Sequence, residues 1–358
     1  MWRVSIVSFY KEIFGQAPAI TARASGRVNI IGEHVDYNGG TVFPAAIDRY
    51  VQAGLSPNSG REHRIASTRF SSVDKRIPGQ PKNGSWSDYA AGALEKATEL
   101  GLLNGPVCLA LESNIPDGAG LSSSSALVAA VLRGCCALSG KTLDPVDLAM
   151  ASRAVENDYI GMPCGIMDQM AIALTTPGQA LALDTAKVSF DLVDIPDAFS
   201  FVILHSGVHR KLSDGRYKVR FEECEAARAA LGAEFLCLLD GPQIAKIPLL
   251  EDNLAARARH VVSEHKRTLA AIEAMRAGEV AEMGRLMNAS HVSYREDFAA
   301  STPEIDALVG TCVEKGAYGT RLTGGGFGGC VVCLVEPGTE DGWVSAVLGV
   351  HPTAQRIV

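Results

Sequence analysis

Apolar residues recur along this chain with two different spacings. Between residues 89 and 100, and again between 126 and 138, they return every three or four positions, which predicts helices. A further helix is predicted over residues 146–157, because Asp144 supplies an N-cap and Pro145 suits the first helical position. Apolar spacing therefore predicts two helices, and helix-start signals predict a third.

Short apolar or alternating runs, each bounded by glycine, proline or aspartate, predict strands between the helices. They lie at residues 107–111, 181–183, 188–193, 201–205 and 331–335. Helices and strands do not alternate with the regular order that a doubly wound sheet requires. The pattern therefore predicts an α+β fold, with an exposed loop at residues 78–84 where proline and glycine cluster.

The length and charge of the chain narrow the class of protein. Its 358 residues are enough for two domains, and the breaker cluster at residues 176–178 predicts domains at 1–178 and 179–358. A hydrophobic content of 47% with a charged content of 20% is typical of a globular protein. The formal charge of −7 argues against a nucleic-acid partner, because phosphates favour clustered Lys and Arg.

The sequence gives no sign of a segment that directs the chain to secretion or into a membrane. Residues 1–12 are too short and too mixed for a secretory signal, and no apolar run approaches the roughly 18 residues that span a bilayer. Nine cysteines without regular spacing suggest reduced, buried thiols, and Cys330 and Cys333 are interpreted as strand residues. We expect a cytoplasmic protein with no membrane partner.

A glycine- and serine-rich loop precedes the helix predicted at residues 126–138. Such a loop directs backbone N–H groups and the positive end of the helix dipole at one point, which suits a phosphate group. Serine hydroxyls add donors and can ligate a hard cation such as Mg²⁺. An ordinary serine-capped helix is the alternative interpretation. The candidate phosphate-binding residues are Gly118, Ala119, Gly120, Leu121, Ser122, Ser123, Ser124 and Ser125.

Two further segments combine glycine with unusual composition. Residues 26–40 hold Arg, Glu, His, Asp and Tyr side chains among four glycines, a density that a fold alone does not require. Residues 322–330 form a second glycine-rich loop, which leads into the predicted strand at 331–335. The chain therefore has three candidate functional loops.

These three segments resemble the three motifs of the GHMP kinases, and residues 26–40 are similar to the galactokinase signature of that family. The resemblance continues, in family order, through residues 86–89, 164–169, 222–225 and 291–297. It implies a GHMP kinase fold. The N-terminal half would be ribosomal-protein-S5-domain-2-like and the C-terminal half ferredoxin-like, with the active site in the cleft between them.

The resemblance also implies chemical roles. Asp168 matches the aspartate that takes the proton of the anomeric hydroxyl, and Arg27 matches the arginine beside it. Ser124 and Glu156 match the ligands of Mg²⁺, with ATP as co-substrate. From the residues alone, Asp168 could instead be a helix-start charge and Glu156 a surface charge.

The resemblance also implies one nucleotide contact and a set of sugar contacts. Trp86 aligns with an aromatic residue near the nucleotide base, although packing explains it nearly as well. His34 alone would suit a structural histidine. The residues that match the sugar ligands of the family are Glu33, His34, Asp36, Gly165 and Tyr217.

The chain departs from the family pattern around Tyr217, where Arg216, Lys218 and Phe221 replace the usual residues. This leaves the identity of the sugar open. The expected activity is ATP-dependent 1-phosphorylation of D-galactose by a monomer. The alternatives are a 1-kinase for N-acetylgalactosamine or L-arabinose, and an inactive sensor of galactose and ATP, which the intact serine loop disfavours.

Overall fold

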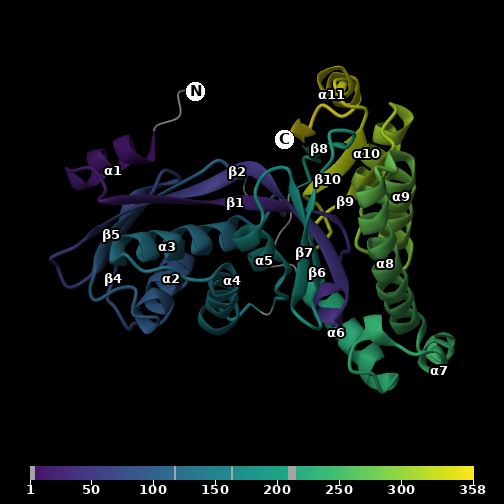
Figure 1. The fold of residues 1–358 in the computed structure, drawn as a ribbon, viewed down its shortest axis with the longest axis horizontal. Coiled ribbons are helices and arrows are strands. Elements are labelled where there is room, and N and C mark those ends of the chain that lie inside the picture. The colour runs from purple at the N-terminus through teal and green to yellow at the C-terminus, as the bar shows by residue number, and fades with distance from the viewer. Residues whose placement is uncertain (1–4, 117, 163, 209–214) are drawn as a thin grey trace. The chain divides into compact units, whose positions relative to one another are not determined.

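The structure is a computed structural model that describes residues 5–116, 118–162, 164–208 and 215–358. The described chain divides into two compact units that are interleaved in sequence (Figure 1). Unit 1 comprises Met1–Arg27, Ile47–Pro116 and Ser122–Thr176, and unit 2 comprises Val28–Ala46, Asp117–Leu121 and Pro177–Val358. The expected division of the family's two halves at residue 178 stays a prediction.

Unit 1 consists of strands with helices on both faces (Figure 1). Strands β4, β3, β5 and β2 are neighbours in that order, β1 also pairs with β2, and β3 runs parallel to β5. The strands are β3 (His63–Ser67), β4 (Phe70–Arg76), β5 (Val107–Ser113), and the unit 1 parts of β1 (Ile20–Ile31) and β2 (Thr41–Pro57), whose residues 28–31 and 41–46 belong to unit 2. The helices are α1 (Ile6–Phe14), α2 (Asp88–Glu99), α3 (Ser123–Ser139), α4 (Pro145–Ala154) and α5 (Met167–Leu174).

Strand periodicity explains how β5 packs in unit 1. Successive side chains of a strand point to opposite faces, so Cys108 and Ala110 share one face and pack against Ile6 and Tyr10 of α1. On α3, a Cβ at Gly134 would lie 2.4 Å from Leu55 Cδ1. The helix therefore needs glycine there to approach β2 closely.

Unit 2 contains an antiparallel sheet in the order β11, β8, β10, β9, and a hairpin, β6 and β7, that pairs with the first residues of β2. Its strands are β6 (Gln179–Asp184), β7 (Ser189–Asp194), β8 (Ser200–His205), β9 (Gly319–Leu322), β10 (Cys330–Val335) and β11 (Gln355–Arg356). Its helices are α6 (Arg216–Ala230), α7 (Gly241–Ile244), α8 (Asp252–Ala277), α9 (Val280–Glu296), α10 (Pro303–Glu314) and α11 (Glu340–Leu348).

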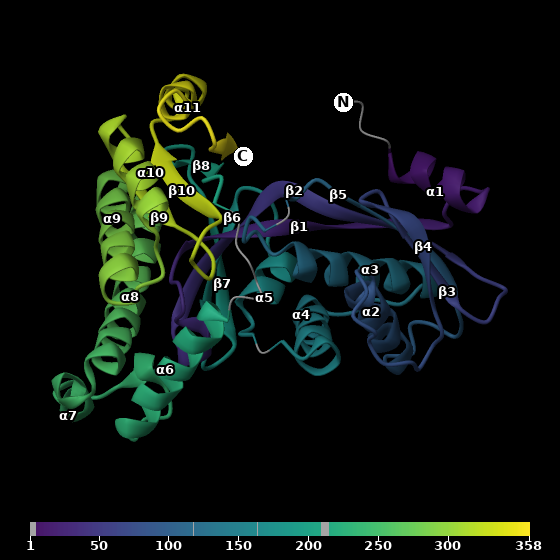
Figure 2. The same ribbon diagram turned by 180° about the vertical axis from the view of Figure 1, so that it is seen from behind.

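The long helices α8 and α9 of unit 2 lie side by side (Figures 1 and 2). Helix α9 also touches β9 at a glycine pair. A Cβ at Gly319 would lie 2.3 Å from the main-chain oxygen of Gly284, and a Cβ at Gly284 would lie 2.4 Å from that of Tyr318. Both glycines are therefore needed for this close approach.

Most predicted elements are confirmed, including the helices at residues 89–100 and 126–138 and all five strands. The prediction of one α-helix over 146–157 is wrong at its end. Helix α4 stops at Ala154, and Val155–Ile160 form a π-helical turn that ends at Gly161. Hydrophobic spacing does not distinguish the wider π-turn, which is frequent at functional sites.

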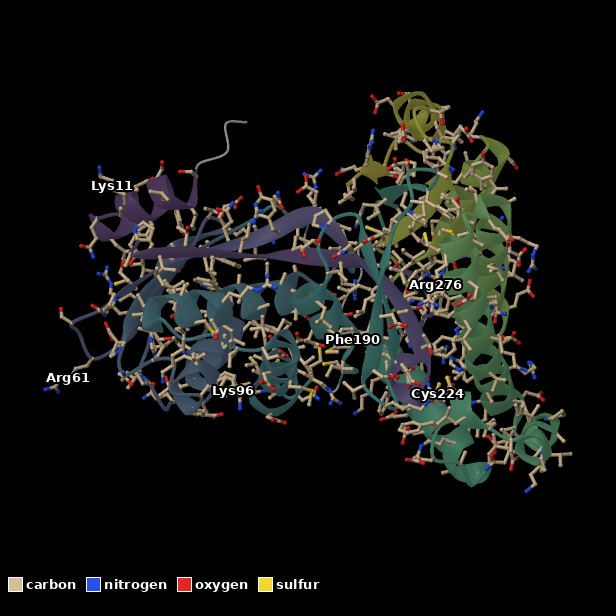
Figure 3. The ribbon with its side chains drawn as sticks, viewed as in Figure 1. Lys11, Arg61, Lys96, Phe190, Cys224 and Arg276 are labelled. Carbon is tan, nitrogen blue, oxygen red and sulfur yellow. The ribbon has the colours of Figure 1, made fainter. Side chains whose placement is uncertain are left out.

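The cysteines follow in part the expectation that they are reduced and buried. All nine cysteines are free, and six are buried, while Cys136, Cys164 and Cys237 are half-buried. Lys11 lies on α1, Arg61 in the loop between β2 and β3, and Lys96 on α2, all in unit 1 (Figure 3). None of the helices in the described ranges combines the length and the apolar character needed to cross a bilayer.

Three buried histidines predict acid sensitivity. Burial lowers the pKa of His63, His260 and His291 from 6.5 to about 4, so each binds a proton in the unfolded chain before it does so in the folded one. The stability that they contribute is complete above pH 6.5 and is lost as the pH falls toward 4. Each should steepen the pH dependence by about 1.4 kcal/mol per pH unit.

Urea unfolding at a series of pH values measures this slope. A His63→Gln variant should show a shallower decline of the free energy of unfolding than the parent chain, because one titrating group is gone. An unchanged slope would remove His63 from the explanation.

Candidate active site

Unit 1 contains a bidentate pair between Arg27 of β1 and Asp168 of α5. Arg27 Nε donates to Asp168 Oδ1 at 2.7 Å, and Nη2 donates to Oδ2 at 2.7 Å. The arginine side chain is 6% exposed and the aspartate 28%, so the carboxylate keeps a solvent-facing part. Two parallel charge-assisted bonds fix the orientation of both groups.

Ser122 completes this arrangement. It lies directly before α3 in the left-handed region, with φ 56°, and its side chain makes no capping bond to the helix. Instead its hydroxyl donates to Asp168 Oδ2. The serine-capped helix considered from the sequence is therefore wrong at this position, and the first N–H groups of α3 have no side-chain cap.

A second carboxylate of unit 1, which is buried, lies on the π-helical turn after α4. Glu156 Oε1 accepts from Ser125 Oγ at 2.5 Å and from Gln169 Nε2 at 3.1 Å. Burial raises the pKa of Glu156, the bond from Ser125 opposes this, and the charge of Asp168 raises the pKa further. At 5% exposure Glu156 is not the surface charge that its sequence position also allowed.

The predicted phosphate loop contributes residues to both units. Gly118, Ala119, Gly120 and Leu121 belong to unit 2, and Ser122–Ser125 belong to unit 1. Gly118 and Gly120 have φ values of 67° and 73°, a conformation that glycine adopts readily. Within unit 2 the loop lies against the third motif, since a Cβ at Gly329 would lie 3.2 Å from the oxygen of Ala119.

Trp86 lies in the loop between β4 and α2 of unit 1. Its ring stacks on Phe70, with centroids 4.6 Å apart and planes 15° from parallel, and Phe70 is 47% exposed. The loop is held by Arg76, whose Nη1 donates to Asp88 Oδ1 at 2.7 Å, while Gly84 N donates to Asp88 Oδ2 at 2.8 Å. A buried ion pair thus supports the segment that carries the aromatic stack.

In unit 2, Glu33 is buried and accepts three bonds at one oxygen. Its Oε1 receives the N–H of Gly324 at 2.8 Å, the hydroxyl of Thr323 at 3.2 Å and Nη1 of Arg321 at 3.2 Å. The first motif is therefore bonded directly to the glycine-rich third motif, although about 290 residues separate them in the sequence.

The next residue, His34, has a positive φ of 60°, and both nitrogens of its ring contact tyrosine hydroxyls. Its Nδ1 lies 2.8 Å from the hydroxyl of Tyr37, and its Nε2 lies 3.0 Å from that of Tyr294. Because Tyr294 donates its proton to the oxygen of Gly324 at 2.8 Å, Nε2 of His34 must be the donor to Tyr294. The contacts of His34 with Tyr37 and Tyr294 are those of a structural histidine, which is the role considered from the sequence.

The other predicted sugar residues lie on three different segments of the chain. Asp36 begins the short helical turn Asp36–Asn38 of unit 2, and its main-chain oxygen accepts from Thr185 at 2.7 Å. Tyr217, at the start of α6, has its ring centroid 5.3 Å from that of His34. Gly165 is half-buried in the loop before α5 in unit 1.

Some residues of these networks had no role assigned from the sequence. Gln169 follows Asp168 directly, and Tyr294 lies within the resembling segment 291–297, so their positions alone were a signal. Arg321 precedes the third motif and carried no such signal. Its role depends on tertiary contacts that no local pattern reveals.

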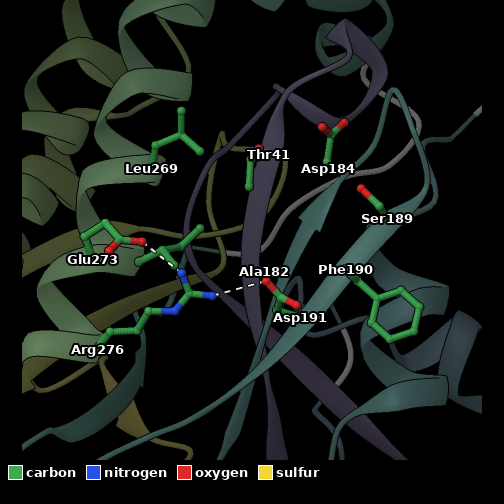
Figure 4. Close-up of a pocket in the computed structure, with 10 residues that line it drawn as sticks. Thr41, Ala182, Asp184, Ser189, Phe190, Asp191, Leu269, Glu273 and Arg276 are labelled. Atoms are coloured by element: carbon green, nitrogen blue, oxygen red, sulfur yellow. Dashed lines mark hydrogen bonds and ion pairs between the residues drawn. The ribbon is translucent and has the colours of Figure 1, made fainter.

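A separate hollow of about 320 Å³ in unit 2 lies between α8 and the β6–β7 hairpin (Figure 4). Arg276 there pairs with Glu273 at 2.9 Å and with Asp191 at 3.3 Å. None of the predicted site residues lines it. The hollow is therefore distinct from the networks above.

Family models match three parts of the chain. The galactokinase galactose-binding signature covers residues 8–57. The N-terminal domain of the GHMP kinases covers residues 88–176, and the C-terminal domain covers residues 271–346. These matches include the segments in which the charged networks lie.

Whole-chain comparisons agree with these matches. Galactokinases of Chloroflexus aggregans and Chloroflexus aurantiacus are each 38% identical to this chain, over 96% of it and 91% of the relative. The crystal structure of Lactococcus lactis galactokinase complexed with galactose matches with a TM-score of 0.92 at 30% identity, covering 98% of this chain and 96% of that one. Methanococcus jannaschii mevalonate kinase, at 18% identity and a TM-score of 0.73, shares the fold. The expected fold is thereby confirmed, and the chain belongs to the galactokinase family of the GHMP kinases.

Proposed function

We propose that this protein transfers the terminal phosphoryl group of ATP to the anomeric hydroxyl of D-galactose, giving α-D-galactose 1-phosphate and ADP. The observation that carries the proposal is the bidentate Arg27–Asp168 pair with Ser122 on the same carboxylate. The family membership supports it.

Asp168 is the group proposed to accept the proton of the anomeric hydroxyl. Arg27 holds its carboxylate in one orientation and would stabilise negative charge on the attacking oxygen. Phosphoryl transfer needs mainly positioning and charge neutralisation, so these two groups and the phosphate loop supply most of what the reaction requires.

The sugar ligands are proposed to be Glu33, His34, Asp36, Gly165 and Tyr217. Oε1 of Glu33 is occupied by protein donors, so Oε2 is the oxygen proposed to meet a sugar hydroxyl. Fixed polar groups of this kind discriminate between sugars, because a missing hydroxyl leaves a buried group unpaired.

Mg²⁺ is the proposed metal, with Ser124 and Glu156 as protein ligands. A buried carboxylate with a raised pKa beside the charge of Asp168 fits a site that a hard cation would complete. No cluster of three or more His, Cys, Asp or Glu suited to a metal occurs in the described ranges, which accords with Mg²⁺ being held largely by ATP phosphates. When bound, the metal neutralises phosphate charge. Trp86 is proposed to contact the nucleotide base.

Glu156→Gln is expected to raise the Mg²⁺ concentration needed for half-maximal rate by about tenfold or more, with the apparent galactose affinity nearly unchanged. The same change replaces a buried carboxyl group whose pKa is raised by burial. Without Mg²⁺, the variant should therefore be more stable than the parent chain at neutral pH by on the order of 1 kcal/mol. Magnesium titrations of the rate and thermal unfolding measure the two effects.

Asp158→Asn is the matched control, because it removes one negative charge from an exposed position of the same π-helical turn. Its magnesium titration should follow that of the parent chain. Identical curves for all three proteins would leave Glu156 without a role in metal binding.

A sugar panel with coupled ADP detection and Mg²⁺ tests the proposed function. We expect ADP release with D-galactose, with lower rates for N-acetylgalactosamine and L-arabinose. Preference for either of those sugars would assign the alternative 1-kinase activity, and binding of galactose and ATP without ADP release would assign the sensor. Monomeric state and cytoplasmic location stay predictions of the sequence.

A further inference from the structure

We propose that Glu264 of α8 is a positioning residue for the sugar-binding turn, acting on it directly and through Arg321 of β9. Neither residue belongs to the predicted ligand set. The inference rests on the proposed function, because it takes residues 32–36 to contact the sugar. All residues that carry it lie in unit 2.

Glu264 first holds the main chain just before Glu33. Its Oε1 accepts the N–H of Gly32 at 3.0 Å, across 232 residues of sequence. Gly32 has a φ of 104°, and a Cβ there would lie 3.0 Å from Thr268 Oγ1 and 3.2 Å from the oxygen of Thr41. The turn therefore fits closely between its neighbours, and the carboxylate sets its position.

Glu264 also acts through a buried arginine. Ser290 Oγ donates to Glu264 Oε1 at 2.6 Å and accepts from Arg321 Nε at 3.0 Å. Arg321 Nη1 then reaches three acceptors of the first motif: the oxygens of Asn29 at 3.2 Å and Ile30 at 3.3 Å, and Glu33 Oε1 at 3.2 Å. One guanidinium thus lies between two carboxylates, one of which is a proposed sugar ligand.

The same face of α8 supplies two more contacts to this turn. His260, one helical turn before Glu264, has its Nε2 3.2 Å from the oxygen of Glu33. Thr268, one turn after Glu264, lies against Gly32. Residues four apart share a helix face, so one face of α8 contacts both residue 32 and residue 33.

Stability alone does not explain so many buried charges. Glu264 and Arg321 are 0% exposed and Glu33 is 3% exposed. Burial alone would raise the pKa of Glu264, but the guanidinium groups of Arg321 and Arg267 lower it to about 2, so the carboxylate is charged. Apolar residues often stabilise a core as well as a buried ion network does, whereas the network fixes geometry.

Glu33 is the nearer carboxylate of Arg321, at 3.2 Å against 3.9 Å for Glu264, and loss of the charge on Glu264 removes the opposing attraction. The guanidinium would then draw Glu33 away from the position in which it meets the sugar. Because small displacements of a positioned group can cost up to about 10²-fold, we expect Glu264→Gln to raise the galactose KM by about 10- to 10²-fold. The ATP KM should stay within about twofold, since the carboxylate of Glu264 bonds to Gly32, Ser290 and Arg267, none of which belongs to the proposed phosphate loop.

The matched control is Arg267→Gln. Arg267 Nε donates to Glu264 Oε2 at 2.8 Å, so this variant also breaks a salt bridge of Glu264, but at the oxygen that does not accept from Gly32. Its galactose KM should stay within about twofold of the parent value. An equal rise in galactose KM in both variants, or in neither, would overturn the proposal.

Two further variants cover a failure of Glu264→Gln to fold. Ser290→Ala removes only the link between the two charges and should raise the galactose KM without a matching change in ATP KM. The pair Glu264→Gln with Arg321→Met removes a carboxylate and a guanidinium together, and Glu33 keeps its bonds from Thr323 and Gly324, so this variant should fold while the galactose KM stays high. A normal galactose KM in this double variant would contradict the positioning role.

Wild-type turnover separates this inference from the proposed function. If the wild type prefers another sugar of the panel, the galactose assignment fails, and the same comparison is made with the sugar that it does accept. If the wild type phosphorylates galactose and Glu264→Gln does so with unchanged KM, only the inference about Glu264 fails. Calorimetric titration of galactose without ATP should show the same loss of affinity.

Discussion

Asp168→Asn is expected to lower the turnover of galactose by about 10²-fold or more, while ATP binding stays nearly unchanged. Asparagine keeps the shape of the side chain and can still accept one bond from Arg27, but its amide cannot take a proton from the sugar. The two bonds from Arg27 and the bond from Ser122 show how completely the fold orients this carboxylate.

Single-turnover kinetics and a titration of ATP measure the two parts of this prediction. A loss confined to the chemical step would support proton acceptance or orientation by Asp168. Turnover near the parent rate would remove Asp168 from the mechanism.

Arg27→Lys is expected to cause a loss of similar size, about 10²-fold or more, because a lysine cannot reproduce the planar fork of a guanidinium. Arg27 uses Nε and Nη2 on two different oxygens of Asp168, whereas an ammonium group offers a single nitrogen. The charge is conserved in this variant, so the loss would report geometry.

Arg23→Lys serves as the control, since Arg23 lies on the same strand and is exposed. Its kinetic constants should match those of the parent chain. Near-normal rates for Arg27→Lys would show that a positive charge suffices and that the bidentate geometry is dispensable.

The sequence was informative where local chemistry decides the structure. The apolar spacing of α3 and the serines before it predicted a helix that starts at a glycine-rich loop, and the structure has both. The apolar run at residues 107–111 predicted a strand, and β5 covers it. The density of polar residues in 26–40 singled out the turn that holds Glu33 and His34, whose side chains bond to Gly324 and Tyr294.

Other features depend on contacts between distant residues and could not be predicted. Ser122 does not cap α3 but bonds to Asp168, 46 residues later, and no local pattern predicts this contact. Glu156 belongs to a π-helical turn, which has no hydrophobic period of its own. Glu264 is one of many acidic residues on a long helix, and only the fold brings it to Gly32.

The position and configuration of the phosphate in the product test the central claim most directly. The protein is incubated with D-galactose, ATP and Mg²⁺, and the product is identified by phosphorus and proton NMR. The account predicts one phosphate on the anomeric carbon with the α configuration, formed in equal amount to ADP. A phosphate on any other hydroxyl, or ADP formed without a phosphorylated sugar, would contradict it.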